Sequence, residues 1–351
     1  MEIPGLKCYG VAEILLFAHS HMSPPSDLSR TLLRYCQPSA GRAVFETGIT
    51  VLPLAALWVL MWLSLDVGYW LTLLLAIPAG GFLVRLFIIQ HDCGHGAFFR
   101  QRIANLWMGR VLGIFTLTPF DYWKRNHAIH HATSSNLDRR GIGDIDLLTV
   151  EEYRSRSWLG RLWYRCYRSV PVMFVIGPAF LFILQQRLPF YQMRDGWRPW
   201  ISTMATNAAI ALMVVAMAWL VGFGPFLMVH LPIMVIAASA GVWLFYVQHQ
   251  FEDVAWARTG DWSHHQAAMA GSSHYDLPVF LRWISGNIGI HHIHHLNSRI
   301  PYYRLPKVLQ DHPELKGVGR ITLKDSLKSV RLSLWCERQE RLVPFSAAAT
   351  K

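Results

Sequence analysis

The sequence predicts an all-α integral membrane protein with two transmembrane helical hairpins (four spans), an interfacial or re-entrant segment and a cytoplasmic helical cap. Three observations support this prediction: long uncharged apolar segments, an uneven distribution of Lys and Arg, and a composition of 52% hydrophobic but only 16% charged residues. Soluble domains usually contain about 25% charged residues. The composition excludes a disordered chain, and the five scattered Cys provide no disulfide framework.

The first hairpin is predicted at residues 47–65 and 67–89. Residues 47–65 and 67–84 contain no Asp, Glu, Lys or Arg, and only Asp66 separates them. About 20 apolar residues are needed to cross a bilayer. We therefore expect two helices joined by a very short turn.

The second hairpin is predicted at residues 200–221 and 226–248. No Asp, Glu, Lys or Arg occurs between residues 199 and 248. One continuous helix of that length would measure about 75 Å, whereas the hydrocarbon core is about 30 Å thick. The chain is therefore expected to turn at the Gly-Phe-Gly-Pro sequence of residues 222–225. Buried core helices of a soluble protein are a much weaker interpretation of these four segments.

Positive charge predicts the side of the membrane on which each loop lies. The hairpin turns contain no Lys or Arg, whereas residues 96–168 contain twelve and residues 187–198 contain three. Because Lys and Arg concentrate in cytoplasmic loops, everything except the two turns is expected in the cytoplasm. Residues 169–186 then form an interfacial or re-entrant segment. The basic residues also suit anionic lipid head groups, so no nucleic-acid partner is expected.

The predicted organisation has three parts. A cytoplasmic N-terminal segment covers residues 1–45, a membrane domain covers residues 46–306, and a basic cytoplasmic tail covers residues 307–351. We expect the chemistry to reside in the membrane domain, on its cytoplasmic side.

Nine of the seventeen His form a pattern at the predicted cytoplasmic ends of the spans. Residues i, i+3 and i+4 of a helix share one face, and three clusters have this spacing. A single His is usually structural, but three such clusters plus a lone His after the fourth span indicate a metal site. His292 and Cys93 fall on other faces and are not taken as ligands. The candidate ligands are His91, His95, His127, His130, His131, His249, His291, His294 and His295.

Nine imidazoles exceed the needs of one ion, so two ions with four or five imidazoles each are expected in the cap. Imidazole binds Zn, Cu, Fe and Ni, and the spacing alone leaves hydrolytic zinc and redox iron open. The sequence lacks the His-Glu-x-x-His motif of zinc peptidases. A metal transporter is disfavoured because transporters place ionisable ligands near the bilayer midplane, and these spans carry almost none apart from His230.

The clusters read HDCGH, HAIHH and HHIHH, in that order around the two hairpins. They resemble the three histidine boxes of the membrane fatty acid desaturases. The flanking sequences HDCGHGAFF and SGNIGIHHIHHLNSRIP are most similar to the delta-12 (omega-6) acyl-lipid desaturases. The resemblance covers roughly residues 45–306. His274 departs from it, since relatives often carry an aromatic residue there, and His264 and His265 are likewise unmatched.

The resemblance implies that the nine His hold two Fe ions in an oxygen-dependent fatty acyl desaturase. Such an enzyme introduces a cis double bond, here expected at the delta-12/omega-6 position, into a membrane-lipid acyl chain. O2 is the co-substrate, and two electrons come from an external donor such as ferredoxin. The alternative is a di-iron fatty acyl or alkyl hydroxylase or monooxygenase on the same scaffold. The expected location is the bacterial inner (cytoplasmic) membrane, with the active site on the cytoplasmic side.

Carboxylates near the clusters are expected to orient the imidazole rings and to offset the charge of the ions. Each of the candidates is equally well explained as a solvated loop charge or a helix cap. The candidates are Asp92, Asp144, Asp146, Glu252 and Asp253.

Overall fold

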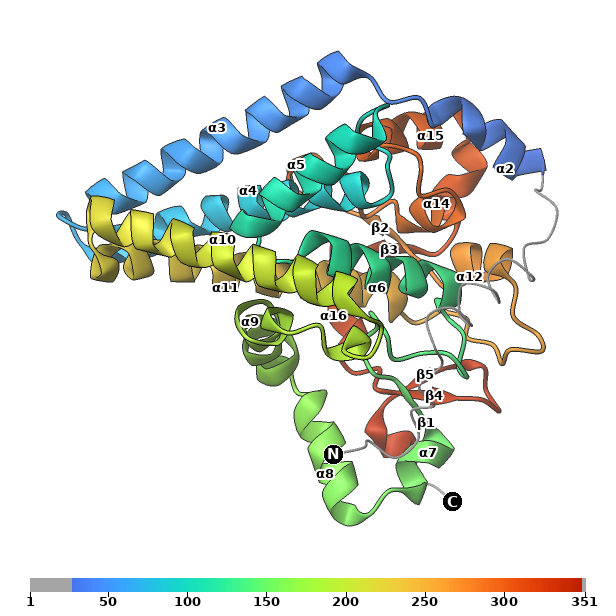
Figure 1. The fold of residues 1–351 in the computed structure, drawn as a ribbon. Helices are drawn as coiled ribbons and strands as arrows, with labels where there is room; N and C mark the ends of the chain where they lie inside the picture. Colours follow the sequence, from blue (N-terminus) through green and yellow to red (C-terminus); the bar gives the residue numbers. More distant parts are fainter. Residues whose placement is uncertain (1–26, 349–351) are drawn as a thin grey trace.

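Four long helices dominate the computed structural model, which describes residues 27–348 (Figure 1). Each is long and apolar enough to cross a membrane, which confirms the four predicted spans. Residues 1–26 of the predicted N-terminal segment and residues 349–351 of the predicted tail lie outside the described residues. The four helices are α3 (Ala40–Ser64), α4 (Tyr69–Gly94), α10 (Trp197–Val221) and α11 (Phe223–His249).

The helices form the two predicted hairpins. The second hairpin turns at Gly222, whose φ of 89° is unfavourable for residues with a Cβ atom. Helix α4 packs against both α3 and α11 and so joins the hairpins. Gly80 permits this close packing, because a Cβ atom there would lie 2.5 Å from Ile236 Cγ2 of α11.

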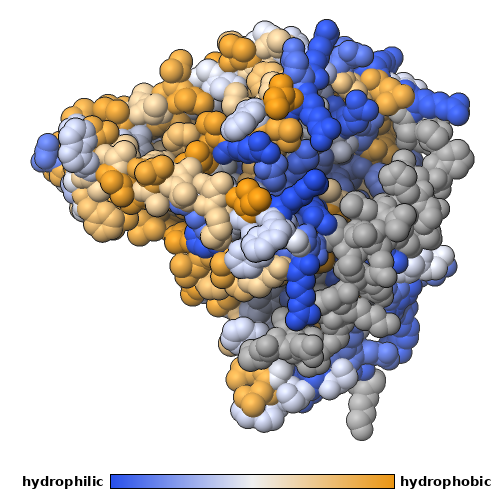
Figure 2. All heavy atoms as spheres, in the orientation of Figure 1, coloured by the Kyte–Doolittle hydropathy of each residue, from blue (hydrophilic) through white to orange (hydrophobic). Residues whose placement is uncertain are grey.

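Helices α4 and α11 extend beyond the predicted spans. Helix α4 continues to Gly94 and α11 to His249, so each long apolar helix ends in a polar segment that carries His. The same end of the molecule holds most of the remaining chain, which we call the cap (residues 95–196 and 250–348; Figure 1). Figure 2 shows apolar side chains over the far ends of the long helices and hydrophilic side chains over the cap.

The cap is largely helical, as predicted. Short 3-10 and π-helical turns are labelled η. Two elements precede the first span: α2 (Asp27–Leu32) and η1 (Leu33–Tyr35). The helical elements of the cap are α5 (Arg102–Phe115), α6 (Phe120–Thr133), α7 (Val150–Ser155), α8 (Trp158–Tyr167), η2 (Val172–Ile176), α9 (Gly177–Ile183), η3 (Gln185–Arg187), η4 (Phe190–Gln192), α12 (His264–Ala270), α13 (Val279–Ile284), α14 (His291–Leu296), η5 (Tyr302–Arg304), α15 (Leu305–Asp311), η6 (Pro313–Gly317), α16 (Leu323–Ser329) and η7 (Phe345–Ala348).

Five short strands tie distant parts of the cap together, and the sequence did not predict them. One sheet has the order β1-β4-β5, with β1 parallel to β4 in the register Leu148↔Leu334 and β4 antiparallel to β5. In the other sheet β2 pairs in parallel with β3, in the register His274↔Arg320. The strands are β1 (Leu148–Thr149), β2 (His274–Asp276), β3 (Arg320–Thr322), β4 (Leu334–Cys336) and β5 (Arg341–Val343).

The segment predicted to be interfacial or re-entrant, residues 169–186, follows a bend in the chain. Helix α8 and the helical residues 172–187 meet at an angle of 59°, which is the geometry of a broken span or a re-entrant loop. Residues 172–176 form a π-helical turn, and Pro178 opens α9. Proline lacks a backbone N–H and interrupts regular helical hydrogen bonding, so the two prolines of this segment explain the irregularity.

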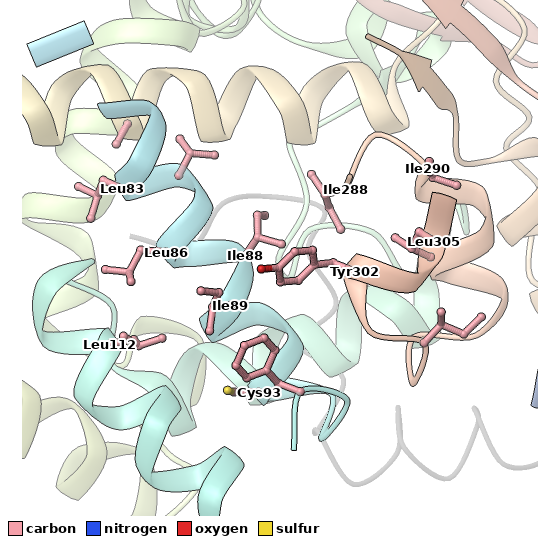
Figure 3. Close-up of a cluster of buried hydrophobic side chains, with 14 of the residues drawn as sticks. Leu83, Leu86, Ile88, Ile89, Cys93, Leu112, Ile288, Ile290, Tyr302 and Leu305 are labelled. Carbon is pink, nitrogen blue, oxygen red and sulfur yellow. The ribbon is translucent and has the colours of Figure 1, made fainter. Parts of the chain in front are cut away.

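The apolar core lies where α4 enters the cap. Figure 3 shows Ile89 and Cys93 of α4 facing Leu112 of α5 and Tyr302 of η5. Cys93 is fully buried in this cluster, so it serves packing, as its helical position predicts.

A buried ion pair links the two helices of the first hairpin, and a hydrogen bond connects it to the cap. Arg85 of α4 and Glu46 of α3 contact each other, and both side chains are at most 2% exposed. The Arg85 Nε–H group donates to Thr50 Oγ1 at 3.1 Å, and the Tyr302 hydroxyl donates to Glu46 Oε2 at 3.0 Å. These hydrogen bonds satisfy charges that would otherwise be costly to bury.

Candidate metal centre

Four elements bring the nine predicted His together. His91 lies in the last turn of α4 and His95 directly follows that helix, α6 carries three, the last residue of α11 is His249, and α14 carries three. Their ring nitrogens converge in two separate groups, each compact enough to surround one ion. The five-histidine group consists of His91, His95, His127, His131 and His294, and the four-histidine group consists of His130, His249, His291 and His295.

In the five-histidine group, one ring nitrogen from each residue lies within 4.8 Å of the others. The Nε2 atom of His127 lies 3.0 Å from that of His95 and 3.1 Å from that of His131. The Nε2 atoms of His131 and His294 are also 3.1 Å apart. His91 and His294 are buried, whereas the other three are partly exposed.

The four-histidine group is wholly buried. The Nε2 atom of His249 lies 3.1 Å from that of His130 and 3.0 Å from that of His291. The Nε2 atoms of His291 and His295 are 3.1 Å apart. Segments separated by more than a hundred residues in the sequence therefore meet at one point.

Two helices contribute to both groups. In α6, His127 and His131 join the five-histidine group, whereas His130 joins the other. In α14, His291 and His295 join the four-histidine group, whereas His294 joins the other. In each helix the two His at positions i and i+4 therefore belong to the same group, as helical spacing requires, and the His at position i+3 belongs to the other group.

Burial favours the neutral form of several of these imidazoles. The pKa values of His127, His131, His294 and His295 lie well below the usual range, first because burial disfavours the charged form and then because neighbouring rings repel a positive charge. A neutral imidazole has a free lone pair, which is the form that binds a metal.

The residues fit two metal ions. Nitrogen atoms 3.0–3.1 Å apart suit neighbouring ligands of one ion, since metal–imidazole bonds are about 2.0–2.1 Å long. An all-nitrogen set of neutral imidazoles suits Fe, Zn, Cu or Ni. Without an ion, nine imidazoles with converging lone pairs would be an unfavourable arrangement to bury.

Two of the predicted carboxylates contact the candidate ligands. His130 Nδ1–H donates to Asp144 Oδ1 at 2.6 Å, which turns its Nε2 atom toward the four-histidine group. Asp92 lies 3.4 Å from His91 Nδ1 and accepts a 2.7 Å hydrogen bond from the backbone N–H of Tyr302. Carboxylates in these positions fix the ring orientation and raise the basicity of the ligand.

The other three predicted carboxylates lie on the surface. Asp146, Glu252 and Asp253 are exposed, and none of them hydrogen-bonds to a His ring within residues 27–348. Asp146 and Asp144 are two residues apart in the same loop, yet only Asp144 turns toward His130.

The His that were excluded as ligands have other contacts. His292 Nε2 lies 3.1 Å from the carbonyl oxygen of Leu315, and His274 Nδ1 donates to the carbonyl oxygen of Lys316 at 2.8 Å. His264 and His265 lie in α12 and belong to neither group. His292 therefore lies outside both groups, in agreement with the helical-face argument.

Three residues make contacts to the His rings that were not predicted. Trp123 stacks on His127, with ring centroids 4.7 Å apart. Phe245 packs on both His130 and His249, at 5.0 and 5.1 Å, and its position one turn before His249 was a usable signal. The carbonyl oxygen of Gly271, 3.3 Å from His249 Nδ1, had no signal in the sequence.

Residues 68–318 match the family model described as fatty acid desaturase. The chain therefore belongs to the fatty acid desaturase family and is an enzyme, which confirms the family resemblance. It is 45% identical to a fatty acid desaturase of Bacillus subtilis (strain 168) over 320 residues, which cover 91% of this chain and 90% of that protein.

More distant relatives carry more specific names. The chain is 28% identical to the sn-1 acyl-lipid omega-3 desaturase (ferredoxin) of Synechocystis sp. over 64% of this chain and 62% of that protein. It is 25% identical to the sn-1 oleoyl-lipid 12-desaturase of the same organism, over 80% of this chain and 78% of that protein.

Proposed function

We propose that the protein is a di-iron desaturase that uses O2 to introduce a cis double bond into an acyl chain of a membrane lipid. The observation that carries this proposal is the convergence of nine imidazoles into groups of five and four, each compact enough to surround one ion. Iron bound there would supply the oxidant needed to break an unactivated C–H bond, which no amino-acid side chain provides.

The chain's own residues hold, orient and shield the two ions. Asp144 orients His130 and Asp92 orients His91, each through the Nδ1 atom of the imidazole ring. Trp123 and Phe245 cover the His rings and limit access of water. The partly exposed five-histidine group is the more accessible of the two, so the substrate is expected to approach from that side.

The substrate and electron donor follow from the family and the membrane helices. We propose a membrane-lipid acyl chain and the delta-12/omega-6 position, supported by the name of the oleoyl-lipid relative. The two electrons would come from an external carrier such as ferredoxin, which the name of the omega-3 relative supports. The Lys and Arg distribution supports a bacterial inner membrane with the active site on the cytoplasmic side.

Expression in a host with simple membrane lipids tests the proposal. Mass spectrometry of the lipids would map the new double bond, and metal analysis of the purified protein should find about two Fe per chain, since two groups of ligands are present. His130→Ala should abolish the product while the protein still inserts into the membrane. His265→Ala, an exposed His outside both groups, is the matched control and should retain activity.

Three results would contradict the proposal. Purified protein without iron would remove the metal assignment. A hydroxylated lipid in place of an unsaturated one would replace desaturation by hydroxylation. Unchanged product from His130→Ala would remove the four-histidine group from the reaction.

A further inference from the structure

A concave site lies in the cap, and none of the nine candidate metal ligands lines it. It has a volume of about 510 Å³ and is formed by β2, α13, α15, η6 and β3. Figure 1 shows β2, β3 and α15 beyond the ends of the long helices. We call it the cap pocket and define it by its ionisable lining residues, His274, Asp276, Arg282, Lys316 and Arg320.

The cap pocket is positively charged. Arg320 is paired with Asp276, whose Oδ2 atom lies 2.7 Å from Arg320 Nη2. Arg282 and Lys316 form no ion pair with an acidic residue in the described part of the chain. Burial lowers the pKa of His274, so this side chain adds no positive charge at neutral pH. Two unpaired cations therefore remain available to an anionic ligand.

The pocket adjoins α13, a short helix that packs against the candidate membrane span α4. Helix α13 packs against α4, where Arg85 donates to the backbone carbonyl of Trp283 and Phe82 contacts the Trp283 ring at 5.9 Å. The start of α13 exposes Val279 and Phe280, which are 73% and 66% accessible. Exposed large apolar residues beside a spanning helix suit contact with lipid. Arg282 follows them within the same short helix and lines the pocket.

We propose that the cap pocket binds the phosphate head group of an anionic membrane lipid, with the acyl chains lying along the exposed residues of α13. Arg and Lys are the usual ligands of phosphate, and basic pockets beside spanning helices attract anionic head groups. A cavity of this volume takes a small molecule, whereas a stable protein partner needs about 800 Å² of surface. The pocket therefore favours a lipid over a protein as its occupant.

Lipid retention by the purified full-length protein in detergent tests this proposal. Native mass spectrometry would compare bound phosphatidylglycerol with bound phosphatidylcholine. We expect the protein to prefer phosphatidylglycerol and the double variant Arg282→Gln/Lys316→Gln to retain at least about tenfold less of it, since each lost charge-assisted hydrogen bond costs about one order of magnitude. The control Lys324→Gln/Arg338→Gln removes two exposed charges elsewhere in the cap and should retain it normally.

Three outcomes would overturn the proposal. The cap-pocket variant could retain phosphatidylglycerol as well as the control does. Inorganic phosphate could bind in a manner that depends on Arg282 and Lys316 while the lipid does not, which would define a site for a soluble anion. An acidic ferredoxin could lose binding to the variant while lipid retention stays unchanged, which would define a protein-docking surface. None of these measurements needs turnover or bound iron, so they are independent of the proposed desaturation.

Discussion

The hydrogen bond between Asp144 and His130 allows a quantitative test of the candidate metal centre. Asp144 Oδ1 and His130 Nδ1 are 2.6 Å apart, and the side chains of Asp144 and His130 are 8% and 1% exposed. A buried charge-assisted hydrogen bond contributes about 1.5–3 kcal/mol. Loss of the bond releases the His130 ring and lowers its basicity, so Asp144→Ala should weaken metal binding by the four-histidine group about 10- to 100-fold.

The assay is metal retention against a competing chelator, with iron quantified per chain in purified protein. Asp144→Asn keeps an oxygen that can accept the hydrogen bond but loses the charge, so its loss of affinity should be intermediate. Asp146→Ala removes an exposed carboxylate from the same loop and should bind metal normally. If Asp144→Ala and Asp146→Ala retained metal equally well, the assigned orientation of His130 would be wrong.

Two further predictions concern stability. Glu46→Ala leaves the Arg85 charge buried without its partner and should lower the free energy of unfolding by about 3–5 kcal/mol. Arg42→Ala removes a half-exposed partner of Glu46 and should lower it by less than about 1 kcal/mol. Unfolding in detergent measures both losses, and equal losses would contradict the buried ion pair. Metal-free protein should lose stability as the pH falls below about 6.5, because the unfolded chain binds protons there while the depressed pKa values of His127 and His131 keep the folded protein from doing so. Thermal unfolding at pH 7.5 and 5.5 measures the direction of this change in stability, and greater stability at pH 5.5 would refute the prediction.

The spans were predictable because the absence of charge is a local property of the chain. Each predicted span lies almost wholly within one long helix, but α4 and α11 run further, to Gly94 and His249. From the sequence, these spans are predicted to end near the last apolar residues of each segment. Helices continue into the cap because packing there supports their polar ends. The strand pairing of Leu148 with Leu334 joins positions almost two hundred residues apart, which no local pattern specifies.

The candidate site was predictable in part because helical spacing, like the absence of charge, is a local property of the chain. Helical spacing selects the His that share a face, and it sets His292 apart from the His of both groups. The division of α6 between two groups depends on how α6 and α14 face each other, which is a tertiary property. Spacing likewise gave no reason to prefer Asp144 over Asp146, because the choice depends on the path of an irregular loop.

The sharing of α6 and α14 between the two groups has a mechanical consequence. His130 and His131 are consecutive residues that belong to different groups, so the separation of two ions bound there would depend on the fixed geometry of one peptide unit in α6. A twist of α6 about its axis would displace ligands of both centres at once. Tilting of the long helices in a thicker or thinner bilayer would leave this internal spacing largely unchanged, and an adjustment of one centre by mutation of α6 would also disturb the other.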